Sequence, residues 1–427
     1  QGTLTDGGDK SLVVASNIDT TGTVRNISGA SDLILTGSGN IYWAATGGGW
    51  NTAFFNGGAF DTWAGSDTSG TTLIGAGDLD VLHTTSFGNL QVATGGELDG
   101  NSTTLTVAGD FTTSGGLIGD SSIVFDGTDD YVASAVFNDD RSVNNSADYT
   151  IELWFRRTET SGTETLFDFA HWDSAGSAYT GQSRSSAYMD ANGVIYWDTR
   201  TGGGTLNARP QSSAGFDDSK WHHAAFVFKG VSGAHAGTYS TGAKEIWIDG
   251  KLEARVLGGD TTTDAGSSVS GNMGYDQNKT MAFQVGRQVV SSIGNFFTGQ
   301  MDEIRMWSDA RTQAEIRNNM FSAVAIDSAN LRHYYDCNFL HSSKLEDMAT
   351  STTGEAHLEV DITFYGGATY AGGGTFDEGS SSTLVMTGTD KRWYMGSYNN
   401  QQLANFTVNG TITLQSIGYG YGAVYFT

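Results

Sequence analysis

Apolar and polar residues alternate along most of this chain, in short runs separated by glycine, asparagine and aspartate. In residues 147–157, "ADYTIELWFRR", the apolar side chains from Tyr149 to Phe155 occupy every second position, so they fall on one face of an extended strand. Residues 244–256, "KEIWIDGKLEARV", place the pair Asp249-Gly250 between two alternating runs, which is a strong hairpin signal. The pattern predicts an all-β protein.

Only one stretch has helical spacing. In residues 308–324, "SDARTQAEIRNNMFSAV", the apolar residues Ala314, Ile316 and Met320 recur at roughly helical intervals after a Ser/Asp start. The strand before it is "GQMDEIRMW", residues 299–307. Strict alternation there puts Glu303 on one face and Asp302 on the other. A carboxylate on a core strand needs a partner, such as an arginine, backbone amides or a metal ion.

Composition supports many short strands and excludes some partners. The 427 residues include 59 glycines and one proline, and 47 acidic residues against 22 basic ones give a formal net charge of −25. Nucleic acids and anionic membranes require basic surface, so neither is expected as a partner. No apolar run approaches the ~20 residues of a membrane-spanning helix, so membrane insertion is not expected.

The chain ends and the single cysteine, Cys337, bear on location. One cysteine allows no internal disulfide, which is unusual for an extracellular animal protein, whereas exterior proteins of bacteria, archaea and viruses often carry none. The chain begins with Gln1 and stops within a strand-like run, so we expect that a segment has been removed or that the sequence is part of a longer one.

Several segments outside the centre resemble one another. Residues 31–43, 121–132 and 381–394 each carry a short apolar strand, a glycine-containing turn and a second strand start, and residues 88–111 resemble 404–420. Such recurrence predicts stacked β-repeats, either a solenoid or a chain of small β-modules. The alternative is that any Gly/Ser/Thr-rich β protein matches itself through composition alone.

The central segment resembles a known family. The stretches "IVFDGTDDYV", "DYTIELWFRR", "FDDSKWHHAAFVFKG", "KEIWIDGKLEA", "AFQVGRQ" and "FFTGQMDEIRMWSDARTQAEI" occur in the order found in the laminin-G-like and pentraxin-like branch of concanavalin A-like jelly rolls. The resemblance implies a sandwich over 118–358, flanked by β-repeat regions at 1–117 and 359–427. The flanks resemble, more loosely, fibre and surface proteins of bacteria and phages. We expect the jelly roll to be inserted into, or appended between, the repeats, with "FDGTDDYV" belonging to both.

The resemblance also implies a possible calcium site. Members of this superfamily frequently hold calcium near acidic loops, and calcium takes carboxylate and carbonyl oxygens. The candidate ligands are Asp126, Asp129, Asp130 and Asp302. The alternative is that Asp126 forms a turn with Gly127 while the other acids are solvated. A second, weaker candidate is "DQNK", residues 276–279.

Other chemistry receives less support from the sequence. His222 and His223 are adjacent on a strand, so they point to opposite faces and do not chelate one ion together. A glycosidase requires a pair of positioned carboxylates, usually at alternate positions of one strand. Neither Glu152 nor Glu303 lies in such a motif, so we expect no enzymatic activity.

Aromatic residues offer another candidate surface. Trp172, Tyr196 and Trp197 of the central segment are candidate carbohydrate contacts, since aromatic faces stack on sugar rings. The same residues serve equally well as core or subunit interface. The crowded aromatics of residues 41–65 are interpreted as core or interface.

Three functions remain open from the sequence. The leading one is a non-enzymatic adhesion or structural protein on a virion or prokaryotic surface, self-associating through its β-repeats. The second is a calcium-dependent lectin that binds cell-surface glycans, and the third, not favoured, is a polysaccharide-active enzyme.

Overall fold

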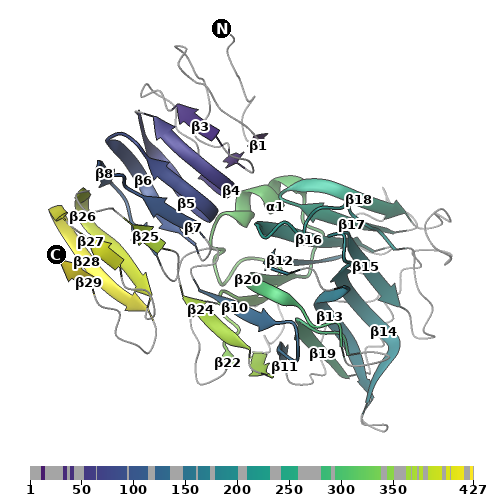
Figure 1. Ribbon diagram of the computed structural model, residues 1–427. Coiled ribbons are helices and arrows are strands. Elements are labelled where there is room, and N and C mark those ends of the chain that lie inside the picture. The colour runs from purple at the N-terminus through teal and green to yellow at the C-terminus, as the bar shows by residue number, and fades with distance from the viewer. Residues whose placement is uncertain are drawn as a thin grey trace. The chain divides into compact units, whose positions relative to one another are not determined.

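The computed structural model describes the chain in two units, residues 1–122 with 371–427, and residues 123–370 (Figure 1). Within these units the described residues are 11–14, 32–35, 39–42, 52–63, 65–93, 96–113, 121–134, 148–159, 162–173, 178–200, 209–230, 242–257, 280–289, 294–337, 344–350, 362–366, 368–372, 375–377, 383–396, 401–403, 405–417 and 424–426. Nearly all the described elements are strands, which confirms the all-β prediction.

The first unit is a stack of parallel strands. Its strands are β1 (Ser11–Val14), β2 (Asp32–Leu35), β3 (Gly39–Tyr42), β4 (Thr52–Trp63), β5 (Gly65–Val81), β6 (Thr85–Val92), β7 (Gly96–Asp99), β8 (Thr104–Val107), β9 (Phe111–Thr112), β25 (Thr375–Asp377), β26 (Thr383–Gly396), β27 (Gln401–Leu403), β28 (Asn405–Ile417) and β29 (Val424–Phe426). Every strand pair among the described residues of this unit is parallel, so the repeats form solenoid-like stacking.

Successive rungs of this solenoid place like residues above one another. Ile74 of β5 pairs with Val92 of β6, and Leu79 of β5 pairs with Leu98 of β7, which gives a period of about 20 residues. All four side chains are fully buried, because each rung has too little apolar surface to close a core alone. Phe54, from the aromatic-rich stretch, is also buried, which confirms the core interpretation there.

The second unit is inserted between two successive rungs of the solenoid. The chain leaves after β9 and returns at β25, where Thr375 pairs with Glu97 of β7. β26 then stacks on β8, with Leu384 opposite Leu105. The ladder therefore continues in register as though the intervening unit were absent. Of the two arrangements open from the sequence, the structure shows insertion.

The inserted unit is a sandwich of two antiparallel sheets. The eight-stranded sheet contains β18 (Lys251–Leu257), β17 (Ala243–Ile248), β16 (Trp221–Lys229), β12 (Tyr149–Arg157), β20 (Thr298–Trp307), β10 (Ser121–Asp126) and β24 (Thr369–Gly372) in that order, with β21 (Leu331–Tyr335) beside β20. The seven-stranded sheet runs β15 (Ile195–Arg200), β14 (Ala178–Met189), β13 (Glu164–Asp173), β19 (Thr280–Val285), β11 (Tyr131–Ser134), β23 (Ile362–Tyr365) and β22 (Lys344–Leu345). The first and last strands of the inserted unit, β10 and β24, are neighbours in the eight-stranded sheet, so both chain connections leave from one place.

The core between the sheets follows the predicted alternation. Ile151, Leu153 and Phe155 of β12 lie in it, and Glu152 and Trp154 face away. The predicted hairpin joins β17 to β18, with positive φ angles at Asp249 and Gly250 as a two-residue turn requires.

The predicted alternation in β20 is wrong after residue 302. Met301, Ile304 and Met306 lie in the core, while Glu303 and Arg305 lie on the other face. The cause is a β-bulge, where the register of β20 against β12 shifts and Glu303 has φ of 50°. The bulge adds one residue, which reverses the facing of those that follow.

The predicted helix exists but is shorter than expected. α1 (Gln313–Met320) begins after Thr312, whose side chain forms a capping box with Glu315, so the cap lies four residues beyond the expected Ser308 start. Ile316 packs on the outer face of the eight-stranded sheet. No helix in the described ranges is long and apolar enough to cross a membrane.

The segment "FDGTDDYV", residues 125–132, does not belong to both units. β10 pairs antiparallel with β20, and β11 pairs antiparallel with β19 and β23, so both strands are part of the sandwich. Their similarity to the solenoid segments at 31–43 and 381–394 reflects a shared strand-turn-strand composition. That part of the repeat prediction is wrong.

Candidate functional site

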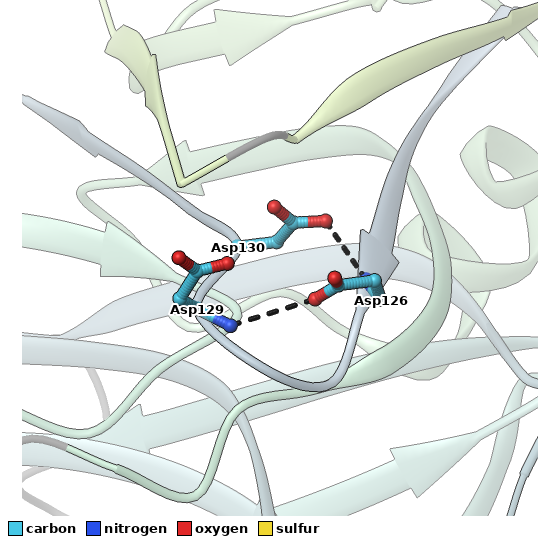
Figure 2. Close-up of side chains that lie close together, drawn as sticks. All are labelled: Asp126, Asp129 and Asp130. Carbon is cyan, nitrogen blue, oxygen red and sulfur yellow. Dashed lines mark hydrogen bonds between the residues drawn. The ribbon is translucent and has the colours of Figure 1, made fainter.

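Three of the four predicted calcium ligands meet in the turn between β10 and β11 (Figure 2). Carboxylate oxygens of Asp126, Asp129 and Asp130 all lie within 4.8 Å of one another. Asp126 Oδ1 accepts hydrogen bonds from the backbone N–H of Thr128 (2.7 Å) and of Asp129 (3.4 Å). Asp130 Oδ2 accepts one from the N–H of Asp126 (2.9 Å). These bonds build the turn that gathers the acids.

The fourth predicted ligand, Asp302, is elsewhere. Asp126 pairs with Thr298 of β20, and Asp302 lies four residues further along that strand, about 13 Å away. Asp302 is fully buried, and its Oδ1 accepts a hydrogen bond from the N–H of Glu303 (2.7 Å). The assignment of Asp302 to the cluster is wrong, because the sequence does not fix the register between β10 and β20. Residues 276–279 lie outside the described residues.

An ordered stack of aromatic rings adjoins the acidic turn. Tyr131 directly follows Asp130, and its ring is parallel to that of Tyr365 on β23, with centroids 4.7 Å apart and 9° between the planes. The Arg287 guanidinium lies 3.2 Å from the Tyr131 ring centroid. Arg287 follows β19, on one side of β11, and β23 lies on the other. Tyr131 is therefore held between Arg287 and Tyr365.

The stack and the acids lie together where the β10–β11 turn meets the end of β23. Tyr365 is 44% exposed, so one part of this fixed ring faces solvent. The next residue, Gly366, has φ of 79°, and a Cβ there would lie 2.2 Å from the backbone oxygen of Asp129. The chain after Tyr365 thus lies directly against the acidic turn, and we call Asp126, Asp129, Asp130, Tyr131 and Tyr365 the rim site.

The three predicted aromatic contacts have different outcomes. Trp197 is fully buried in the sandwich core, and its indole N–H donates to Ser185 Oγ (3.0 Å), so its assignment as a carbohydrate contact is wrong. Alternation explains this, because Trp197 follows the outward-facing Tyr196. Trp172 lies in β13 and its backbone pairs with Thr280 of β19, but its side chain lies outside the described residues.

Tyr196 lies on the outer face of the seven-stranded sheet in a second aromatic stack. Its ring stacks on that of its cross-strand neighbour Tyr188, with centroids 5.2 Å apart and 17° between the planes. Arg209 lies over the Tyr196 ring at 4.9 Å and donates to the Tyr188 hydroxyl (2.7 Å). Tyr196 in turn donates to Asp190 Oδ2 (3.2 Å).

The two glutamates considered for catalysis are buried behind the eight-stranded sheet. Glu303 contacts Arg305 in a short ion pair and accepts from the Tyr334 hydroxyl (2.8 Å), and burial raises its pKa to about 7. Glu152 lies 3.4 Å from His223 and is also fully buried. Neither carboxylate is accessible to a polysaccharide. Of the three partners expected for the carboxylates of this strand, two are found. Arg305 pairs with Glu303, and a backbone N–H donates to Asp302.

The adjacent histidines point to opposite faces, as predicted. His222 lies between Asp249 (2.9 Å from Nδ1) and Asp218 (3.0 Å from Nε2), and Asp249 also accepts from the N–H of His223. Burial opposes the charged imidazole, but the two carboxylates outweigh it and raise the pKa of His222 to about 9. This pair of contacts ties the β17–β18 hairpin to the start of β16.

Comparison with known proteins finds a family similarity within the inserted unit. Residues 126–317 match Laminin_G_3, described as the concanavalin A-like lectin/glucanases superfamily. The predicted laminin-G-like resemblance of the central segment is confirmed. A search of curated proteins finds no match.

Solved structures with similar folds are distant in sequence. They include a protein from Bacteroides ovatus (18% identity, 59% of each chain covered, TM-score 0.37), the CBM40 module of the Ruminococcus gnavus IT-sialidase (10%, 43% of this chain and 90% of that chain, 0.31) and domains LG4-5 of the mouse laminin alpha1 chain (10%, 48% and 46%, 0.29). The match spans 59% of the length of the Bacteroides ovatus protein.

Proposed function

We propose that the protein is a non-catalytic, exterior glycan-binding protein of a prokaryotic cell surface or virion, in which the sandwich binds carbohydrate at the rim site. The observation that carries this proposal is the exposed Tyr365 ring, fixed by its stack on Tyr131 beside three clustered carboxylates. A fixed aromatic ring provides the apolar face on which a sugar stacks, at little entropic cost on binding. Carboxylates provide acceptors for sugar hydroxyls.

Calcium belongs to the same proposal. Asp126, Asp129 and Asp130 would hold the ion, since calcium takes six to eight hard oxygen ligands and three carboxylates within 4.8 Å match that preference. The bound ion would neutralise the gathered charge and coordinate hydroxyl groups of a glycan. The turn geometry does not depend on the ion, because backbone N–H groups already hold Asp126 and Asp130.

The solenoid is proposed as the carrier of the binding unit. β28 pairs with β26, β29 pairs with β27, and neither has a second neighbour among the described strands. Such edges favour pairing with another chain, so we propose that the protein self-associates through this unit. Light scattering across a concentration series tests this, and a monodisperse monomer at high concentration contradicts it.

A glycan array with and without EDTA tests the binding proposal. We expect retention on at least one glycan class, loss of most retention with EDTA, and at least tenfold weaker binding for Tyr365→Ala and for Asp129→Asn. Leu257→Ala and Asp327→Asn are matched controls, because both residues are exposed and lie away from the rim site. Absence of binding to every glycan, with the protein folded and calcium present, overturns the proposal.

A further inference from the structure

The seven-stranded sheet carries two aromatic stacks of the same design. Each contains two tyrosines on neighbouring antiparallel strands, with rings stacked across the strands, and an arginine over one of the rings. At the rim site these are Tyr131 and Tyr365 with Arg287. At the other stack they are Tyr188 and Tyr196 with Arg209.

Both stacks face the same side of the sheet. Val132 next to Tyr131, and Ala187 and Trp197 next to the other pair, lie in the core between the sheets. Because neighbours on a strand point to opposite faces, all four tyrosines point away from that core. The outer face therefore carries both stacks.

The strand register places the stacks in one row across the sheet. Tyr365 pairs with Tyr131, and Tyr188 pairs with both Thr165 of β13 and Tyr196 of β15. The two tyrosine pairs are linked across β19 and β13. Gly286, which directly follows β19, donates its N–H to the backbone oxygen of Leu166 on β13, next to Thr165. Tyr131 and Tyr188 are thus three strands apart, about 14 Å at the usual strand spacing.

We infer that this face binds an extended oligosaccharide with several sugar rings, with one end on the rim site and the other on the stack of Tyr188, Tyr196 and Arg209. This inference rests on the proposed function and names its ligand class. A mono- or disaccharide does not reach across 14 Å and contact both stacks, whereas a longer chain does. Once one end of the oligosaccharide is bound, the other end is held near the second stack at a high effective concentration. The second contact therefore raises the overall affinity.

Chain length provides the test. Calorimetry with the full chain and calcium compares chito-, cello-, xylo- and manno-oligosaccharides of two and six sugar units. We expect the hexasaccharide of the recognised series to bind at least tenfold more tightly than its disaccharide. Tyr188→Ala and, separately, Arg209→Ala should remove this gain while leaving disaccharide binding and the melting temperature near the wild-type values. Tyr365→Ala should weaken binding of both lengths.

The outcomes separate this inference from the proposed function. Equal affinity for the two lengths, with binding still sensitive to Tyr365→Ala, overturns the extended ligand and leaves the rim site in place. A length effect that survives both Tyr188→Ala and Arg209→Ala also overturns it, because the second contact then lies elsewhere. Absence of binding to any glycan overturns the proposed function, and this inference with it.

Discussion

At the scale of single residues, His222 shows how the fold changes proton affinity. Asp218 and Asp249 flank the buried imidazole and raise its pKa from 6.5 to about 9. The folded state therefore binds the proton more tightly than the unfolded chain does. The resulting stability is fully present below pH 6.5 and is lost as the pH rises through 9.

We predict that His222→Gln lowers the free energy of unfolding by about 2 kcal/mol at pH 6 and by much less at pH 10. The value is below what the full pKa shift implies, because Asp218 and Asp249 are partly exposed and solvent screens them. Thermal unfolding at both pH values measures the difference. His83→Gln, at an exposed position of the solenoid, is the control. A loss that is the same at both pH values contradicts the prediction.

At the scale of elements, the solenoid stacks acids in a column. Asp61 of β4, Asp80 of β5, Asp99 of β7 and Asp377 of β25 occupy successive positions of one parallel ladder. Like charges at directly opposed positions are destabilising. The backbone register continues from Asp99 to Asp377 across the insertion.

We predict that Asp80→Asn stabilises the solenoid by about 0.5 kcal/mol at low ionic strength, and by less in 0.5 M NaCl because salt screens the repulsion. The Asn101 side chain, which donates to Asp80 Oδ1 (3.2 Å), keeps an acceptor in the variant. Melting curves at two salt concentrations measure the effect, with Asp110→Asn as an acid of the same unit outside the column. Destabilisation at low salt is the contrary result.

Elements were more predictable than their mutual registers. Alternation identified β12, β16 and the β17–β18 hairpin, because period and turn chemistry are local. It failed at Glu303, since a bulge depends on the partner strand. The acidic cluster at Asp126 was predictable because its members are close in the sequence. Tyr365, Arg287 and Arg209 were missed. They reach their stacks from distant parts of the chain, and no spacing in the sequence signals it.

At the scale of the whole molecule, the insertion predicts that the two units fold separately. Residues 1–113 joined to 375–427 by a short Gly/Ser linker should form a solenoid, because β25 and β26 stack on β7 and β8. Residues 121–372 should fold alone, because their core is closed between two sheets. Circular dichroism and cooperative melting of each piece test this. Aggregation of the joined solenoid, with the intact chain well folded, contradicts it.

The same insertion has a consequence for mechanical load. A domain fused at a chain end is held by one covalent connection, but the sandwich is held by two, after β9 and before β25. A force applied to the sandwich therefore divides between two covalent connections, each leading to a strand of the parallel ladder. A single protease cut within either tether leaves the binding unit attached to its carrier. The insertion therefore gives an attachment that survives the failure of one covalent connection.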